Sequence, residues 1–186
     1  MRKSFGPKPI TYPQPVFIIA SFDEQGHPNA MNAAWGGISE QNEISLCLSA
    51  HHKTVLNILS SKVFSVAMGS VEQVVACDYV GIETGLKRAD KLEKAGWHVE
   101  KGHSVPCPII VELPLALECR LIDYNPETCI MRGEIVDVSV DEKALTPEGK
   151  IDVKKLNPII FDPANGQYLS VGEAVAKAFS SGLALR

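Results

Sequence analysis

The feature that most constrains this chain is a series of short apolar segments separated by tight turns. Val16–Phe22 (VFIIASF) is a continuous apolar run typical of a buried strand. Asp23–Gly26 predicts a turn in which Gly26 takes a positive φ, so that the chain returns through Asn29–Trp35 as a hairpin. Further strands are predicted at Glu43–Leu48, Val63–Met68, Leu115–Asp123 and Thr128–Val140. About six antiparallel strands with glycine- and proline-rich turns favour a closed barrel over an open parallel sheet.

Helical spacing is confined to short segments. The sequence predicts a helix at Lys53–Ser61 with Ser49 as its cap, and further helices at Val71–Tyr79, Lys87–Gly96 and Val171–Ser181. Residues 97–108 are expected to be irregular because of their prolines, and Gly36-Gly37 should break a strand. Strands and helices do not alternate regularly, and no repeat or linker divides the chain. We therefore expect one mainly β domain with peripheral helices, residues 1–186.

Composition limits the partners of the chain. The net charge is −4 without a cluster of lysine and arginine, which argues against a protein that binds nucleic acid through its phosphates. No apolar run is long enough to cross a membrane, and no apolar stretch of signal-peptide length precedes Val16, so we expect a cytoplasmic protein. The chain has five cysteines, an odd number, and no two of them are spaced as C-x-x-C. They are interpreted as small apolar residues in a reducing compartment, not as a zinc site or a redox dithiol.

The segment Ser49–Thr54 (SAHHKT) is unusual at the start of a predicted helix. A helix N-terminus carries partial positive charge, so Lys53 in the first turn is unfavourable by roughly 0.3–1 kcal/mol. A bound anion would reverse this effect, because backbone N–H groups, hydroxyls and the lysine could converge on a phosphate. A solvated lysine is the alternative. His51 and His52 suggest a metal only weakly, since no carboxylate or cysteine is spaced to join them.

The segment Asn29–Trp35 surrounds one large aromatic residue with small ones. The small neighbours of Trp35 would leave room for a flat ring, although Trp35 could also be a core residue, and Asn29 and Asn32 could face water. No G-x-G-x-x-G is present, so any nucleotide is bound without a Rossmann turn. No G-x-S-x-G and no distinct Ser/His/Asp or Cys/His set supports nucleophilic catalysis, and no catalytic side chain is assigned.

Six sequence segments are most informative when they are taken together, in their order along the chain. They are PVFIIASFDEQGHPNAMNAAWGGIS, SLCLSAHHKTVLNI, VFSVAM, GLKRADKLEKAGW, MRGEIVDV and YLSVGEAVAKAFSSG. In this order the chain resembles the flavin reductase-like, FMN-binding split-barrel family, and within it the flavoredoxin-like branch. The resemblance covers nearly the whole chain and implies a six-stranded antiparallel Greek-key barrel with peripheral helices. It also implies a homodimer that holds FMN noncovalently near the dimer interface.

The resemblance also assigns the cofactor site. It implies that Asn29, Ala30, Met31, Asn32, Ala33 and Trp35 line the flavin and its ribityl chain, and that Ser49, Ala50, Lys53 and Thr54 hold the phosphate and adjacent backbone. Lys91 would approach the isoalloxazine, and Phe161 and Tyr168 match aromatic positions of the C-terminal loop, which the partner subunit could contribute. One departure is Thr128, which stands where many relatives carry a histidine.

The family chemistry agrees with the absence of an acid–base set, because hydride transfer is performed by the cofactors themselves. The first expectation is an oxidoreductase that passes electrons from NAD(P)H through FMN to free flavin or another acceptor. The alternative is an electron-transfer flavoprotein reduced by a protein partner, with little NAD(P)H activity, and Thr128 favours it slightly. A third possibility is a split-barrel interaction module without flavin, against which the intact Asn29–Thr54 segment argues.

Overall fold

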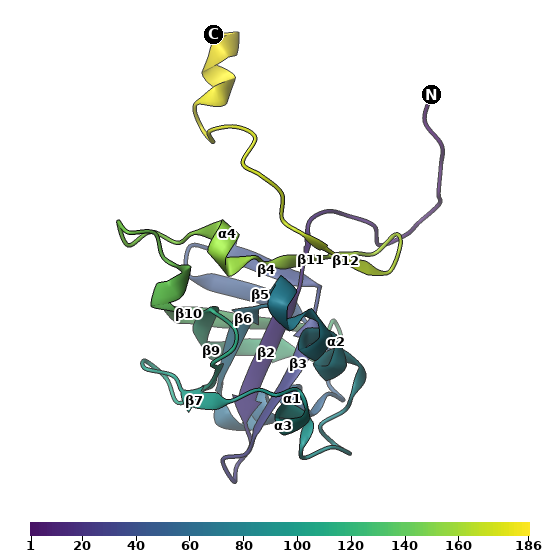
Figure 1. Ribbon diagram of the computed structural model, residues 1–186. Coiled ribbons are helices and arrows are strands. Elements are labelled where there is room, and N and C mark those ends of the chain that lie inside the picture. Colours follow the sequence, from purple (N-terminus) through teal and green to yellow (C-terminus); the bar gives the residue numbers. More distant parts are fainter.

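The computed structural model describes residues 1–186 and is mainly β, with a few short helices at its periphery (Figure 1). Its main sheet contains seven antiparallel strands. In spatial order these are β3 (Pro28–Ala33), β2 (Phe17–Phe22), β6 (Val63–Met68), β9 (Leu115–Asn125), β10 (Ile130–Val140), β5 (Glu43–Cys47) and β4 (Gly36–Glu40). Three neighbouring pairs, β2 with β6, β6 with β9 and β10 with β5, are not consecutive in the chain, so strands distant in sequence pair. The predicted fold class is confirmed, with seven strands in this sheet where the resemblance implied six.

The strands β3 and β4 follow each other in the chain but occupy opposite edges of the sheet. No ladder joins them, so the barrel is split at this seam and is not closed as the strand pattern alone favoured. The residues Ala34 and Trp35 connect the two edges. The predicted break therefore comes before Gly36, which begins β4. A Cβ on Gly36 would lie 2.7 Å from the Ser45 carbonyl oxygen, so this strand contact requires glycine.

The core lies on both faces of β2. Ile18 and Ala20 belong to one cluster of buried apolar residues, whereas Phe17 and Ile19 belong to a second. Successive side chains of a strand point to opposite faces, so a strand buried on both sides needs an uninterrupted apolar sequence. This explains the run VFIIA and its correct prediction as a buried strand.

Some of the predicted helix bounds are confirmed, and others differ in the structure. The helix α1 (Lys53–Ser61) has the predicted bounds, but its N-cap is His52 and no side chain caps it, so the prediction of Ser49 as cap was wrong. The helix α2 (Val74–Ile82) follows a 3-10 turn, η1 (Val71–Gln73), and extends beyond its predicted end. The helix α3 (Lys91–Lys94) is much shorter than predicted, although Gly96, with a φ of +73°, does follow its end.

Residues 97–108 are not irregular throughout, which corrects the prediction. Here β7 (Val99–Lys101) pairs with β8 (Pro108–Ile110), and the loop between them folds over a buried carboxylate. Glu118 of β9 accepts hydrogen bonds from the backbone N–H groups of His103, Ser104 and Val105 at 2.8–3.0 Å. A carboxylate that is taken out of water must be hydrogen-bonded in this way. The residue that orders this loop therefore comes from a distant strand.

The C-terminal third ends in a second small sheet and an exposed tail. The small sheet contains β1 (Gln14–Pro15), β11 (Ile159–Asp162) and β12 (Gln167–Ser170). The 3-10 turn η2 (Glu142–Ala144) and the helix α4 (Val153–Leu156) lie between β10 and β11 in the chain. The predicted helix Val171–Ser181 is absent; only the 3-10 segment η3 (Ser181–Leu185) forms, and this tail leaves the body of the molecule (Figure 1). Val175 and Phe179 are fully exposed, so the apolar spacing of this segment has no surface to pack against within the chain. No helix has the length and apolar character needed to span a membrane.

Candidate functional site

The two polar segments singled out in the sequence lie next to each other. Asn29 on β3 donates from Nδ2 to the Thr54 hydroxyl in the first turn of α1, at 2.7 Å. The Asn29 side chain is 5% exposed, and its Oδ1 accepts no hydrogen bond within the chain. This oxygen is not sealed in the interior, because Asn29 lines a cavity, so it remains available to accept a hydrogen bond from a ligand or water.

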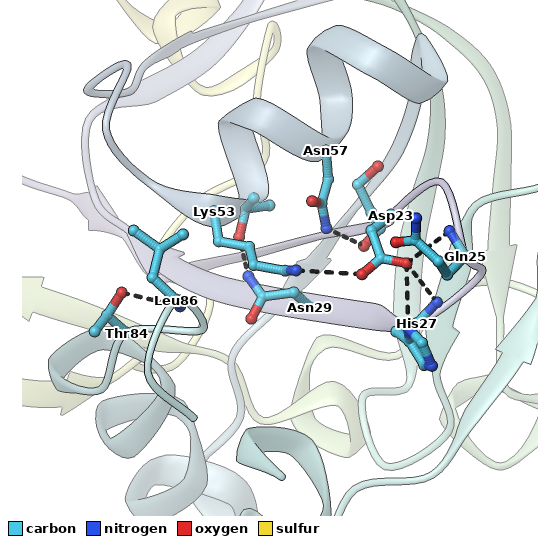
Figure 2. Close-up of polar contacts among 10 residues, drawn as sticks. Asp23, Gln25, His27, Asn29, Lys53, Asn57, Thr84 and Leu86 are labelled. Carbon is cyan, nitrogen blue, oxygen red and sulfur yellow. Dashed lines mark hydrogen bonds and ion pairs between the residues drawn. The ribbon is translucent and has the colours of Figure 1, made fainter. Parts of the chain in front are cut away.

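Lys53 has a carboxylate partner that the sequence did not reveal. Its Nζ lies 3.2 Å from Asp23 Oδ2, in the turn between β2 and β3, and Figure 2 shows the lysine reaching toward this turn beside Asn29. Burial alone would raise the pKa of Asp23, but the His27 N–H and then Lys53 hold it below its ordinary value. The carboxylate is therefore ionised at neutral pH. Lys53 is neither freely solvated nor committed to a ligand, because an anion would compete with Asp23 for it.

Lys91 is a buried cation. Its side chain is 3% exposed, and Nζ donates one hydrogen bond, to the Ala30 carbonyl oxygen at 2.7 Å. Burial lowers the pKa of Lys91 to about 8, against an opposing effect of Glu83. An ammonium can donate three hydrogen bonds, so two N–H groups remain for a ligand or water. A mostly charged, underused ammonium at neutral pH is a strong site for an anionic or electron-rich group.

Three cavities adjoin these residues. A cavity of about 170 Å³ is lined by Asn29, Asn32, Thr54, Lys91 and residues 80–85, which are the end of α2 and the residues after it. A second, of about 440 Å³, shares Met31, Asn32 and His52 with the first and is mostly apolar, with Ala33, Trp35 and Phe161 on its wall. The largest, of about 660 Å³, lies on the other side of Lys53 and includes Asp23, His27, Arg88 and His98. Together they offer a polar recess, an apolar slot and a charged outer chamber along one path.

Glycines bring the end of α2 and the residues after it against β3. A Cβ on Gly85 would lie 2.1 Å from Asn29 Oδ1, and one on Gly81 would lie 3.0 Å from the Asn32 Cβ. A larger residue at position 85 would displace the Asn29 side chain, and one at position 81 would crowd Asn32. The spacing of these two glycines does not match a Rossmann turn. In the structure they close the recess around the two asparagines.

Comparison with known proteins identifies the family. Residues 10–162 match the flavin reductase like domain family. The chain belongs to this family. Flavoredoxin of Desulfovibrio vulgaris (Miyazaki F) is 37% identical, with a TM-score of 0.93, covering 98% of this chain and 100% of that one. Flavoredoxin from Methanosarcina acetivorans is 25% identical, with a TM-score of 0.88 and full coverage of both chains. Nitrilotriacetate monooxygenase component B from Bacillus cereus, 20% identical with a TM-score of 0.75 over 95% of this chain and 99% of that one, shares the fold.

This flavin reductase-like chain places most of its predicted cofactor residues around the cavities. Trp35 is 54% exposed at the mouth of the apolar slot, so it is not a core tryptophan. Ser49 lines the same slot, while Ala50 lines none of the three cavities. Ala30 is buried in the core and contributes its carbonyl oxygen to Lys91. Thr128 lies in an exposed turn, where its N–H donates to Asn125, and lines none of these cavities.

The two predicted aromatic residues come from the small sheet of the same chain. The rings of Phe161 and Tyr168 are 6.2 Å apart and tilted. The Tyr168 hydroxyl donates to Asp78 on α2 at 2.8 Å and accepts a long hydrogen bond, 3.5 Å, from Asn32. Burial and then Asp78 raise the pKa of Tyr168 to about 12, so the phenol stays protonated. Phe161 reaches the slot directly, whereas Tyr168 acts on it through Asn32.

Sequence reasoning missed several residues of the site. Asp23 and Arg88 carry no motif, and only the folded hairpin brings Asp23 to Lys53. His52 was considered for a metal, but it lines both the recess and the slot, and no group of three His, Cys, Asp or Glu side chains is placed to hold a metal ion. Burial, then the Lys91 charge, lowers the pKa of His52, so the imidazole is neutral at pH 7.

The residues present fit FMN. The cofactor has a flat ring, a hydroxylated chain and a phosphate, which require an apolar slot, amide and hydroxyl partners, and a cation. The chain provides these as the slot beside Trp35 and Phe161, the amides of Asn29 and Asn32, and the ammonium groups of Lys53 and Lys91. Membership of the flavin reductase like family supports the prediction of FMN as cofactor.

Proposed function

We propose that this chain binds FMN and transfers electrons from NAD(P)H, through the bound flavin, to free flavin or another acceptor. The observation that carries the proposal is Lys91, a buried ammonium with unused N–H groups in a recess shared with Asn29 and Thr54. Bound FMN would supply the hydride chemistry. The protein would contribute binding, orientation and charge.

Each group of residues has a separate task in this proposal. Thr54 and Lys53 hold the phosphate, with Lys53 released from Asp23 as the anion binds. Asn29 and Asn32 orient the polar edge of the ring system, and Trp35 and Phe161 cover its faces and exclude water. The Lys91 ammonium stabilises the negative charge of reduced flavin. No side chain needs to move a proton.

The decisive experiment starts with the colour of the purified protein. A yellow preparation, or a colourless one that takes up added FMN, supports the proposal; failure to bind added FMN would refute it. Anaerobic mixing with NADH or NADPH should then bleach the flavin rapidly. Lys91→Ala should weaken FMN binding and lower the flavin midpoint potential, while Lys94→Ala on the same helix should change neither.

A second candidate function is supported by Thr128 and by the similarity to two flavoredoxins. In this alternative the chain is a flavoredoxin-type electron-transfer protein that a redox protein reduces, with little NAD(P)H activity. Thr128 is an exposed turn residue and cannot perform the role of a histidine facing the ring. Flavin-loaded protein that remains oxidised with both nicotinamide nucleotides, yet is reduced by dithionite, would select this alternative.

We also infer that the chain functions as a cytoplasmic homodimer. The free thiols of all five cysteines suit a reducing compartment. Apolar side chains remain exposed around the slot, including Trp35 and Ile38 on the β4 edge, and along the C-terminal tail. A second copy would bury them.

A further inference from the structure

The five cysteines fall into two classes. Cys77, Cys107 and Cys119 are fully buried, and burial raises the pKa of the Cys77 thiol to about 11 and that of Cys107 to about 12. These thiols stay protonated and unreactive. Cys47 and Cys129 are only half-buried, and both lie on the wall of the apolar slot beside Trp35 and Phe161. The two accessible thiols of the chain therefore share one cavity, although they are distant in sequence.

The backbone brings these two cysteines close enough to bond. Cys47 is paired with Ile130 in the ladder between β5 and β10, and the Leu48 N–H donates to the Cys129 carbonyl oxygen at 2.8 Å. Standard antiparallel spacing then puts the Cα atoms of Cys47 and Cys129 about 6 Å apart. Disulfides span Cα separations of about 4.4–6.8 Å.

Cys129 lies in the turn that precedes β10 and departs from strand geometry. In a regular ladder the side chains of Cys47 and Cys129 would point to opposite faces. Cys129 has a φ of +60°, in the left-handed region, so the alternation of a strand does not fix the direction of its side chain. Its Sγ donates to the Pro126 carbonyl oxygen at 3.8 Å, so the thiol is reduced here. Burial and then the neighbouring Cys129 and Cys47 sulfurs raise the pKa of the Tyr124 hydroxyl, so both sulfurs lie near this one group.

We propose that Cys47 and Cys129 form a reversible dithiol–disulfide pair, a second two-electron redox centre on the wall of the slot. Its substrate class is a thiol–disulfide couple. One cysteine thiolate attacks an external disulfide RSSR, forms a mixed disulfide and releases RS⁻. The second cysteine sulfur then attacks the bonded cysteine and releases the other RS⁻. The two protons of the dithiol end on the two released thiols, giving protein disulfide and two RSH.

The pair would also be placed to exchange electrons with FMN held in the slot, an extension that rests on the proposed function. Oxidation of the dithiol to the disulfide releases two electrons and two protons. FMN, when bound, could accept both electrons with one of the protons, and the other proton would pass to solvent. In the opposite direction, the cofactor would supply the two electrons that open the disulfide. The chain would thus connect nicotinamide or protein donors with disulfide acceptors.

The first test needs no cofactor. The purified chain is equilibrated with oxidised glutathione, freed of it, and unfolded for thiol counting and peptide mapping. We expect the count to fall from five free thiols to three, with one cross-link that joins the Cys47 and Cys129 peptides and a mass loss of two hydrogens. Cys47→Ser should abolish the cross-link. Cys129→Gly, which suits a φ of +60°, should do the same while keeping the fold. An unchanged count, separate glutathione adducts on the two cysteines, or a cross-link to a buried cysteine would overturn the proposal.

The second test separates this inference from the proposed function. Preoxidised, FMN-loaded protein is titrated anaerobically with dithionite. Wild-type protein should take up twice as many electrons per chain as Cys47→Ser, with the excess appearing as two new thiols. Equal uptake by the two proteins, with the cross-link present, would refute electron exchange with the flavin. Failure to bind FMN would instead refute the proposed function and leave the cross-link result standing.

Discussion

At the scale of single residues, two lysines in opposite environments govern the site. Lys53 is partly exposed and held by the Asp23 carboxylate, whereas Lys91 is buried and bonded only to a backbone carbonyl. The first can change partner at little cost, because exposed ion pairs contribute only about 0–1 kcal/mol. The second is a fixed charge that a ligand must accommodate. In the proposed function, Lys53 would therefore bind an anion first, and Lys91 would select among the anions that reach the recess.

Asp23→Asn tests the competition for Lys53. Removing the carboxylate should tighten FMN binding about two- to five-fold at low salt, in keeping with the strength of exposed ion pairs. The dissociation constant, measured by quenching of flavin fluorescence at several salt concentrations, reports this change. Asp123→Asn is the matched control, since it breaks an ion pair with Arg132 that lies outside the cavities. Weaker binding by Asp23→Asn would show that Asp23 orients Lys53 and does not compete for it.

Lys91 should make the stability of the cofactor-free protein depend on pH. The pKa of Lys91 is about 8 in the folded chain, below its ordinary value of 10.5, so the unfolded chain binds more protons between these values. Stability therefore rises with pH across this window, and the cost of burying the charge is fully present below pH 8. Lys91→Met should remove this rise in urea unfolding at pH 7 to 10, while Lys94→Met should retain it. Parallel curves for Lys91→Met and wild type would contradict a buried ammonium.

At the scale of elements, the site depends on segments held by distant contacts. Residues 80–85, at the end of α2 and just after it, closely approach the asparagines of β3, and the loop of the β7–β8 hairpin is bonded to Glu118 on β9. Each segment is short and contacts a strand that is distant in sequence. Its order is therefore a property of the assembled sheet.

Glu118→Gln should destabilise the whole domain through one loop. The carboxylate accepts three backbone hydrogen bonds, and the amide can accept them only through one oxygen, which leaves a buried N–H opposed by an NH₂ group. We expect a loss of about 2–4 kcal/mol in the free energy of unfolding, measured with urea. Glu134→Gln, at an exposed ion pair with Arg120, should change stability by less than about 1 kcal/mol. A loss below 1 kcal/mol for Glu118→Gln would mean that water replaces the lost acceptor.

The regular elements could be predicted from the sequence because their signals are local. The bounds of α1 and β6, and the buried nature of β2, follow from apolar periodicity within each segment. The hairpin β7–β8 could not be predicted, since it depends on a carboxylate from β9. The helix expected at Val171–Ser181 had the right spacing but no surface to cover. For the site, the family resemblance grouped Asn29, Thr54 and Lys91, which line one recess, whereas the pairing of Asp23 with Lys53 spans 30 residues and leaves no local signal.

At the scale of the whole molecule, the seam of the split barrel has two strand edges without a partner strand, and the C-terminal tail has apolar side chains without a packing surface. The edges β3 and β4 pair with no strand across the seam, and the slot opens beside it at Trp35. The tail extends from the body and carries exposed apolar side chains (Figure 1). Both features are consistent with the proposed homodimer, in which a second copy would cover them.

Deletion of residues 172–186 should separate folding from assembly. Within one chain the tail makes few contacts, one of them an exposed ion pair between Lys154 and Glu173, so the unfolding of the isolated chain should hardly change. If the tail packs on a second copy, the dimer should dissociate at higher protein concentration than wild type, as measured by sedimentation. A stable dimer of unchanged affinity would show that assembly uses the β4 side alone, where Ile38→Asp should then disrupt it.

The contrast between the two tryptophans gives the protein its own optical probe. Trp97 is buried, and its indole N–H donates to Gln73, whereas Trp35 stands half-open at the seam. Emission from Trp97 should be shifted to the blue and inaccessible to iodide, while Trp35 should emit further to the red and be quenched. A ring that enters the slot should quench the red-shifted fluorescence of Trp35 and leave the emission of Trp97 unchanged. Occupancy of the slot could then be followed by tryptophan fluorescence, for coloured and colourless ligands alike.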